Sequence, residues 1–223
     1  MSGLKAAVVP VTPFQQNCAI LFDAASKRGA VVDPGGEVPR LLDAIEKLGV
    51  TVEQILLTHG HIDHAGGAAG LREALSSPER PVPVIGPDAR DRFLLEGLEE
   101  QGRAYGIAGV RNVVPDRWLV EGDTVEVAGH VFDVLHCPGH TPGHVVFHSK
   151  ADKFALVGDV LFRGSVGRSD FPYGDGAALI RSIQEKLFPL GDAVTFLCGH
   201  GPGSTFGAER TGNPYVGDAA VRG

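Results

Sequence analysis

The chain has 223 residues and a formal net charge of −7 at pH 7, with 43% apolar and 21% charged residues. This is a globular composition, and the length leaves room for one full domain, so we expect a single domain over residues 1–223. The acidic balance disfavours nonspecific binding to nucleic acid, and no apolar run approaches the roughly 18 residues of a membrane span. We therefore expect neither a nucleic acid nor a membrane among the partners.

The predicted elements alternate between strands and helices at first and are mostly strands later. Apolar and alternating runs predict strands at residues 5–11, 17–23, 30–33, 54–57, 83–85, 117–119, 124–127, 131–135, 144–148, 154–157 and 194–198. Helical spacing of apolar residues predicts helices at residues 38–48, 65–75, 88–98 and 177–187, and a loop is expected at 102–109. Strands in both halves, with helices between them, indicate two sheets packed face to face with helices outside.

The cysteines indicate a reducing compartment. Cys18, Cys137 and Cys198 form no CxxC motif and cannot all pair with one another. The N-terminal stretch is too short and too weakly apolar for a secretory signal. We therefore expect a cytoplasmic protein with reduced thiols.

One short segment concentrates groups that bind metals. The run Thr58-His59-Gly60-His61-Ile62-Asp63-His64 places three histidines and one aspartate within six residues, directly after an apolar strand. Imidazole and carboxylate groups are ligands of zinc and iron. Gly60 carries no side chain, so the flanking histidines can approach one ion. The segment therefore predicts a metal site at a strand end.

Three further glycine-rich loops follow predicted strands in the same way. His140 follows the strand at 131–135, Asp159 follows the strand at 154–157, and His200 follows the strand at 194–198. Loops that converge at one edge of a sheet can assemble a metal site from distant parts of the sequence. We expect these side chains to join the first segment.

Together these motifs resemble those of the metallo-β-lactamase superfamily. The resemblance extends from Asp33-Pro34-Gly35 to His200 and implies a four-layer αββα sandwich, an α/β fold. Within the superfamily the chain looks like the short, single-domain proteins of the hydroxyacylglutathione hydrolase (glyoxalase II) branch. The few residues after His200 leave no room for the helical glutathione-binding domain of full-length members, which we therefore expect to be missing.

The resemblance implies a ligand set and a reaction. His59, His61 and His140 would hold one metal ion. Asp63, His64 and His200 would hold a second ion, and Asp159 would bridge the two. Asp63 and Asp159 are accordingly the candidate catalytic residues. Two divalent ions are implied, zinc above all, with iron or manganese as alternatives. A metal-bound hydroxide would attack a thioester carbonyl, and the small-molecule substrate would be S-lactoylglutathione or a similar hydroxyacyl thioester.

Three residues have a functional and a structural interpretation. Asp33 and His144 could each hydrogen-bond to metal ligands without binding the metal themselves. In the structural interpretation, Asp33 forms a turn with Pro34 and Gly35, and His144 is a polar histidine on a strand. Arg168 matches a basic residue that helps to bind glutathione in the branch it resembles, or it could pair with Asp170 in a turn.

Two other functions compete with a thioester hydrolase. The resemblance also extends to persulfide dioxygenases, in which a single iron would be held by His59, His140 and Asp159. A metal-bearing binding module without turnover is the third hypothesis, although every ligand position is filled. The sequence leaves the oligomeric state open.

Overall fold

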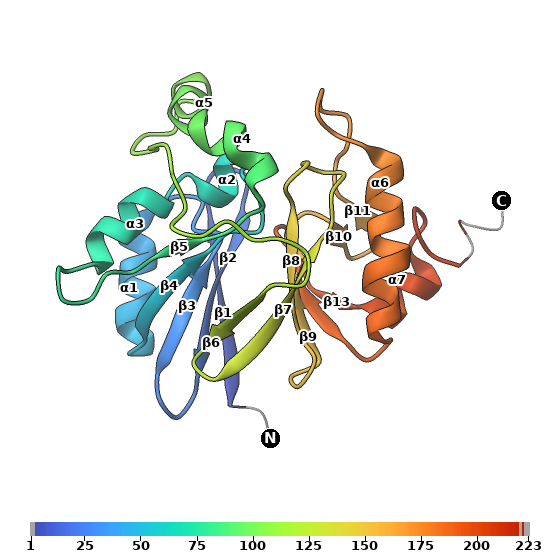
Figure 1. The fold of residues 1–223 in the computed structure, drawn as a ribbon, viewed down its shortest axis with the longest axis horizontal. Helices are drawn as coiled ribbons and strands as arrows, with labels where there is room; N and C mark the ends of the chain where they lie inside the picture. The colour runs from blue at the N-terminus through green and yellow to red at the C-terminus, as the bar shows by residue number, and fades with distance from the viewer. Residues whose placement is uncertain (1–2, 219, 221–223) are drawn as a thin grey trace.

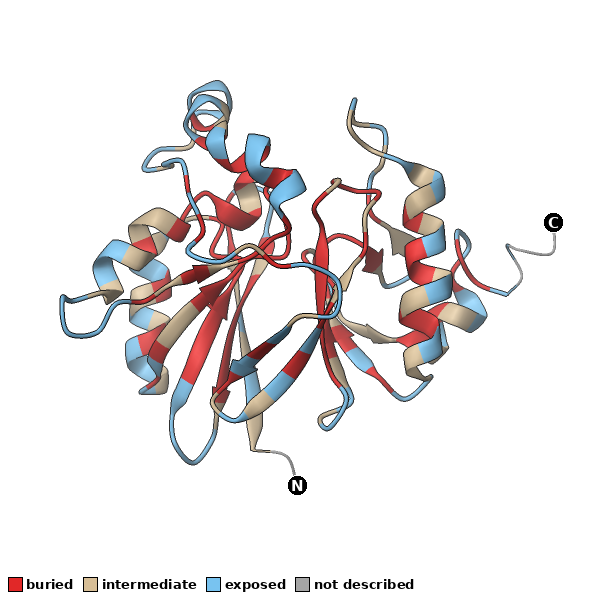
Figure 2. Cartoon of the chain, viewed as in Figure 1, coloured by how far each residue is buried: buried red, intermediate tan, exposed pale blue. Residues whose placement is uncertain are grey.

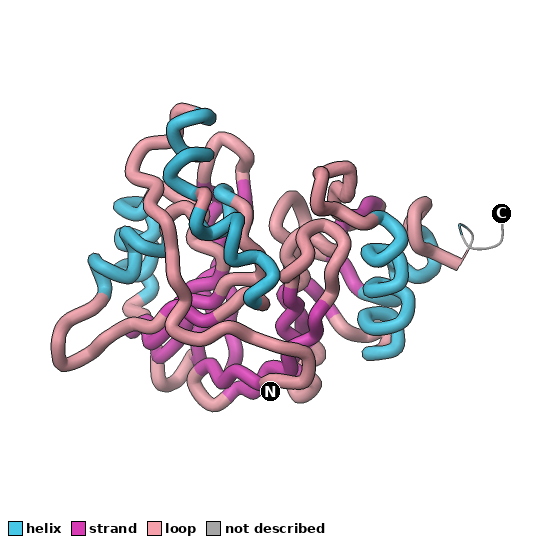
Figure 3. Tube along the Cα trace, turned by 45° about the horizontal axis from the view of Figure 1, so that its top comes forward, coloured by secondary structure: helices cyan, strands magenta, loops and turns pink. Residues whose placement is uncertain are grey.

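The computed structural model describes residues 3–218 and residue 220. Two β-sheets lie face to face, and helices cover the outer face of each (Figure 1). A tube view shows the strands between helices on both sides (Figure 3). The predicted four-layer αββα sandwich is therefore confirmed.

The first sheet contains the strands of the N-terminal half in the order in which they occur in the chain. Its members are β1 (Leu4–Val11), β2 (Gln16–Asp23), β3 (Arg28–Val32), β4 (Thr51–Leu56) and β5 (Val84–Ile85). Strands β1, β2 and β3 pair antiparallel, whereas β3, β4 and β5 run parallel. Parallel strands bring their carboxyl ends to one edge, which is where the histidine-rich segment begins.

The second sheet has the strand order β13-β12-β9-β8-β7-β6. Its members are β6 (Thr124–Val127), β7 (His130–His136), β8 (Val145–Ser149), β9 (Phe154–Leu156), β12 (Thr195–Leu197) and β13 (Ser204–Thr205). Strands β9 and β12 are parallel, and the other neighbours are antiparallel. A two-stranded ribbon, β10 (Leu161–Phe162) with β11 (Ser165–Val166), follows β9.

The helices fall into three groups. The first sheet is covered by α1 (Val38–Leu48) and α3 (Ala68–Leu75). The second is covered by α6 (Gly176–Arg181), the π-helical η2 (Ser182–Leu187), the short η3 (Phe188–Leu190) and α7 (Phe206–Gly212). The rest gather at one end of the sandwich (Figure 1): α2 (Ile62–Ala65), η1 (Ala89–Asp91), α4 (Arg92–Glu96) and α5 (Leu98–Tyr105).

The apolar core has three parts that correspond to the three interfaces between layers. The middle part joins the two sheets and includes Leu21 and Leu56 from the first sheet and Phe132 and Phe147 from the second. The other two parts lie between each sheet and its helices. Strands such as β2 are buried on both faces, and Figure 2 shows buried residues concentrated along the strands.

Most predicted elements are found close to their expected positions. The helix at 38–48 is confirmed residue for residue and ends at Gly49, which adopts the left-handed conformation with φ of 65°. The predicted helix at 65–75 is interrupted, because residues 66 and 67 separate α2 from α3. A Cβ on Gly67 would lie 2.7 Å from the carbonyl oxygen of Pro34, so tertiary packing sets the break.

Other predictions were wrong. The expected strand at 117–119 is reduced to a single bridge between Ile85 and Arg117. The expected helix at 88–98 is divided into η1, α4 and the start of α5. The loop expected at 102–109 begins instead as the last turn of α5. The sequence patterns also missed β10, β11, β13 and α7, which are all short.

Two further observations concern the whole described chain. The three cysteines are buried and unpaired, as expected. Across residues 3–218 and residue 220, no helix combines the length and apolar character that crossing a membrane requires.

The core between the sheets gives a stability prediction. Phe147→Ala removes a fully buried ring and should lower the free energy of unfolding by about 3–5 kcal/mol. Val131→Ala, at a position that is 52% exposed on the neighbouring strand, should change it by less than about 0.5 kcal/mol. Urea denaturation of both variants checks this, and equal losses would contradict the assignment of the core.

Candidate metal centre

The candidate site lies at the end of the sandwich where strands from both sheets terminate. The loop after β4 carries His59 and His61, and α2, which follows it, carries Asp63 and His64. The remaining predicted ligands come from the second sheet: His140 between β7 and β8, Asp159 after β9, and His200 after β12. The two sheets therefore both contribute to one site.

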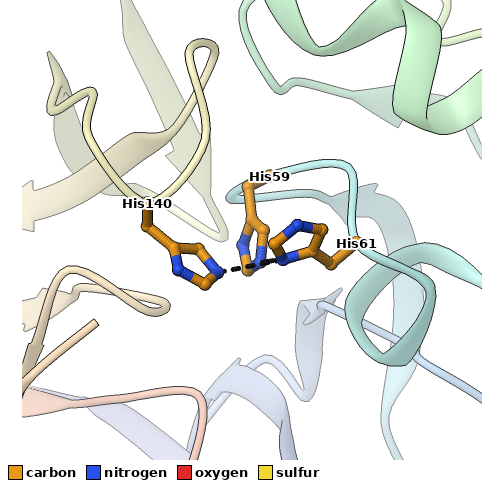
Figure 4. A group of neighbouring side chains, drawn as sticks. All are labelled: His59, His61 and His140. Atoms are coloured by element: carbon orange, nitrogen blue, oxygen red, sulfur yellow. Dashed lines mark hydrogen bonds between the residues drawn. The ribbon is translucent and has the colours of Figure 1, made fainter. Parts of the chain in front are cut away.

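Three histidines form the first ligand group. His59, His61 and His140 point toward one another from two loops (Figure 4). Nδ1 of His61 lies 3.2 Å from Nε2 of His59 and 2.9 Å from Nε2 of His140. Three imidazole nitrogens thus converge on one point.

A second group lies beside the first. Asp63, His64 and His200 each offer one ligand atom within 4.8 Å of the others. Asp159 lies between the groups, because its carboxylate is 3.6 Å from Nε2 of His140, 3.5 Å from Nε2 of His200 and 3.3 Å from Nε2 of His64. The structure therefore brings all seven predicted ligands together, with Asp159 central.

Each histidine in these groups uses its outward ring nitrogen in a hydrogen bond. Nδ1–H of His140 and His200 donates to carbonyl oxygens, of Arg168 at 2.6 Å and Phe14 at 3.1 Å. Nδ1–H of His64 donates to the Asp33 carboxylate at 2.9 Å. Because these acceptors have no proton to give, Nδ1 carries a proton in each of the three rings, and the inward Nε2 presents a lone pair when the ring is neutral.

The two remaining histidines follow the same rule. Nδ1 of His59 lies 3.0 Å from the Thr58 hydroxyl oxygen, whose own proton is donated to Asp33 at 2.6 Å. His61 is turned the other way, since its Nε2 lies 2.9 Å from the Tyr173 hydroxyl and its Nδ1 faces the other ligands. The Thr58 hydroxyl therefore accepts from Nδ1–H of His59, and His61 presents an inward lone pair when the Tyr173 hydroxyl accepts from its Nε2–H.

Asp33 and His144 both contact the ligand shell. Asp33 is buried and accepts hydrogen bonds from the Thr58 N–H at 2.8 Å, the Thr58 hydroxyl and His64. Nε2 of His144 accepts the backbone N–H of Asp159 at 3.0 Å, and its ring stacks on His59 with centroids 4.6 Å apart. Both residues are placed where they orient ligands.

Burial and neighbouring charge divide the histidines into two electrostatic classes. Burial, reinforced by neighbouring imidazoles, lowers the pKa of His59 well below its usual value and that of His61 to about 3. Burial opposes the charge on His64, but the carboxylates of Asp159 and Asp63 outweigh it and raise the His64 pKa. Burial also acts to raise the Asp159 pKa, but His64 and other imidazoles hold it well below its usual range. A cation that binds here would displace the second proton of the charged His64 ring, the one on its inward Nε2.

The donor atoms fit a divalent cation. Nε2 of His64 and Oδ1 of Asp159 are buried and face each other at 3.3 Å, but neither makes a hydrogen bond of good geometry within the described residues. Leaving such atoms unsatisfied costs free energy, which binding to a cation would recover. Imidazole and carboxylate are ligands for zinc, iron and manganese, so the chemistry of the set agrees.

Two glycines give the site its close spacing. A Cβ on Gly199 would lie 2.0 Å from Oδ1 of Asp159 and 2.5 Å from Cε1 of His64. A Cβ on Gly158 would lie 2.6 Å from Nε2 of His144, and its φ of +48° also favours glycine. Side chains at these positions would fill the space between the ligands.

A pocket of about 390 Å³ opens over the ligands. Its wall combines five predicted ligands with aromatic, aliphatic and polar side chains: Phe14, Ile62, Gln101, Tyr105, Arg168, Phe171 and Tyr173. Arg168 pairs through Nε with Asp170, and its guanidinium lies 4.5 Å from the Phe171 ring centroid. The turn pair is therefore present, and the same side chain also lines the pocket.

Sequence reasoning missed two residues that contact the ligand loops. Tyr173 contacts His61, and Asp91 accepts the backbone N–H of Gly60 at 2.9 Å. Neither occurs in a pattern with metal-ligand spacing. The one sequence feature that could have pointed to Tyr173 is its position close to Arg168, a candidate substrate-binding residue.

Comparisons with known proteins agree with this geometry. The sequence profile of the metallo-beta-lactamase superfamily matches residues 11–200. The chain is 44% identical over 210 residues to the hydroxyacylglutathione hydrolase GloC of Haemophilus influenzae, which covers 94% of this chain and 96% of GloC. Among solved structures it is similar to the BLEG-1 B3 metallo-beta-lactamase, with a TM-score of 0.85 and 32% identity. This match covers 95% of this chain and 99% of BLEG-1. It is also similar to TTHA1623 in a di-iron-bound form, with a TM-score of 0.80 and 37% identity. This match covers 94% of this chain and 100% of TTHA1623.

The chain belongs to the metallo-beta-lactamase superfamily. The predicted resemblance and the predicted class, a metal-dependent hydrolase, are confirmed. The clustered histidines and aspartates support divalent metal ions as its cofactors.

Metal analysis tests the ligand set. The purified protein should hold about two divalent ions per chain, and His59→Ala should lower that number because it removes one inward nitrogen from the first group. His130→Ala is the control, since His130 pairs with Asp152 at 2.9 Å and belongs to neither ligand group. The metal content per chain of both variants is measured by plasma emission spectrometry, and their unfolding temperatures are recorded to check that they fold. Equal metal content in the two variants would contradict the assignment.

Proposed function

We propose that this protein hydrolyses thioesters, with S-lactoylglutathione or a similar hydroxyacyl thioester as its substrate. The observation that carries the proposal is the pair of ligand groups, joined by Asp159, beneath a single pocket. The similarity to GloC, named as a hydroxyacylglutathione hydrolase, supports this substrate class. A small-molecule substrate also suits the volume of the pocket.

The ligand assignment follows the two groups. His59, His61 and His140 would hold one ion, and Asp159 would contact both. The second ion would be held by Asp63, His64 and His200. When bound, the two cations would lower the pKa of a shared water toward ~7 and polarise a carbonyl group. Zinc suits these ligands, and the di-iron form of TTHA1623 keeps iron as an alternative beside manganese.

The surrounding residues would hold protons in place during turnover. Asp33 keeps the His64 proton on Nδ1, and the Arg168 carbonyl keeps the His140 proton on Nδ1. Tyr173 supports His61 from the pocket side. Fixed tautomers spare the site from reorganising as substrate binds.

The pocket wall would orient the substrate. The side chain of Arg168 is 65% exposed. Its guanidinium could therefore turn away from Asp170 and pair with a carboxylate of the substrate, such as one on a peptide-like thiol. Phe171 and Tyr173 stack with centroids 5.4 Å apart and form an apolar side of the pocket. Such a wall contacts the apolar parts of a substrate and excludes water.

A mononuclear-iron persulfide dioxygenase is the second candidate. The subset His59, His140 and Asp159 that it would use lies within the same site, with Asp159 3.6 Å from His140. The convergence of Asp63, His64 and His200 on a second group favours the dinuclear hydrolase, because a mononuclear site leaves those side chains without a role.

We also propose a single catalytic domain over residues 1–223 that acts in the cytoplasm. Both sheets contribute ligands to the one site, which supports a single unit. Unpaired, buried cysteines are typical of a reducing compartment.

Two assays decide between the candidates. The metal-loaded protein should hydrolyse S-lactoylglutathione, and Asp159→Ala should lower kcat/KM at least about 100-fold because it removes the group shared by both ions. The iron-loaded protein should consume no oxygen with glutathione persulfide. Oxygen uptake by a protein with a single iron and no thioesterase activity would overturn the proposal.

Arg168 gives a test of substrate orientation. Arg168→Ala should raise KM for S-lactoylglutathione about 10-fold and leave kcat nearly unchanged, because its guanidinium contacts the substrate away from the reacting carbonyl. Arg163→Ala, an exposed arginine in the β10–β11 turn, is the matched control and should leave both constants unchanged. An unchanged KM in Arg168→Ala would show that this residue serves only the turn.

A further inference from the structure

We propose that Asp91 is a positioning residue that fastens the loop carrying His59 and His61 to the loop carrying His140, and so sets the spacing of the first ligand group. Asp91 ends η1, outside every motif that carries the ligands, and its side chain is fully buried. The inference rests on the proposed metal chemistry but not on the identity of the substrate.

The side-chain hydrogen bonds of Asp91 lead to the two ligand loops. Oδ2 accepts the backbone N–H of Gly60 at 2.9 Å and the hydroxyl of Thr141 at 2.7 Å. Oδ1 accepts the backbone N–H of Gly143 at 2.6 Å. One carboxylate therefore joins segments that are some 80 positions apart in sequence and come from different sheets.

The donors are immediate neighbours of the ligands. Gly60 lies between His59 and His61, and Thr141 follows His140. A shift of either backbone segment would move an imidazole whose inward nitrogen lies about 3 Å from the next one. Hydrogen bonds to a charged acceptor are stronger than neutral ones, which suits the carboxylate to this task.

The two glycines beside these contacts are explained by the approach of Asp91. A Cβ on Gly143 would lie 2.6 Å from the Asp91 nitrogen and 2.7 Å from Oδ1. A Cβ on Gly60 would lie 3.1 Å from the Asp91 carbonyl oxygen and 2.7 Å from the Cβ of Leu94. Both ligand loops are therefore shaped to admit the turn that carries this carboxylate.

Burying Asp91 carries a cost. Burial raises its pKa to about 6, although the hydrogen bonds from Thr141, Gly60 and Gly143 act to lower it. An amide of similar shape would avoid the cost of burying a charge, but its NH₂ cannot accept a hydrogen bond. The carboxylate is the side chain that accepts all three donors of the ligand loops.

The test compares Asp91→Asn with Asp88→Asn. Asp88 is also buried and belongs to the same turn, but within the described part of the chain its side chain accepts its hydrogen bonds from Arg90. In Asp91→Asn, the amide NH₂ faces a donor, so at least one of the three loop contacts is lost. We expect one zinc ion to bind about 10–100-fold more weakly in Asp91→Asn and within about twofold of the parent in Asp88→Asn.

Affinity is measured by titration of the metal-free full chain with zinc against a chromophoric chelator, with unfolding temperatures recorded alongside. The cobalt-substituted proteins give a second readout, since a displaced imidazole should change the visible spectrum of Asp91→Asn and not that of Asp88→Asn. Equal zinc affinities and equal spectra in the two variants would overturn the proposal, even if Asp91→Asn unfolds at a lower temperature.

Thr141→Val keeps the proposal testable if Asp91→Asn does not fold. It removes one donor and leaves the carboxylate with its two backbone partners. A weaker zinc site in Thr141→Val supports the role of Asp91, and parent-like zinc affinity overturns it. Neither result depends on thioesterase activity, so failure of the substrate proposal is distinguishable.

Discussion

The site depends on the direction of five ring protons. Each predicted ligand histidine has one nitrogen hydrogen-bonded to a group outside the cluster, and its other nitrogen faces inward. Carbonyl oxygens and the Asp33 carboxylate fix three of these tautomers outright, because they can only accept. With the inward nitrogens aligned in advance, the binding of metal ions need not reorganise the rings. The remaining cost is the displacement of protons such as the one on Nε2 of the charged His64 ring.

Strand ends from both sheets make this convergence possible. The parallel pair β3–β4 and the parallel pair β9–β12 direct their carboxyl ends toward the site, and the loops after them carry most of the ligands. Glycines at positions such as Gly199 leave room between ligands that a Cβ would occupy. The high glycine content of the chain is therefore concentrated, in part, where the loops must approach one another.

Much of the fold and of the site could be predicted from the sequence, but not every contact. The helix at 38–48 was predictable because its apolar face and its terminal Gly49 are local signals. The break between α2 and α3 was not, because contact of Gly67 with Pro34 creates it. The seven candidate ligands could be chosen because their motifs match a known family, and the structure brings their side chains together. Tyr173 and Asp91 could not, because each acts through one tertiary contact that no local spacing encodes.

The central claim is that two metal ions are held on either side of Asp159 by inward-facing nitrogens. Anomalous diffraction at the zinc edge from crystals of the zinc-loaded protein tests it most directly. The account predicts two peaks, one contacted by Nδ1 of His61 with Nε2 of His59 and His140, the other by Asp63, His64 and His200. A single peak, or coordination of His61 through the nitrogen that now faces Tyr173, would contradict it.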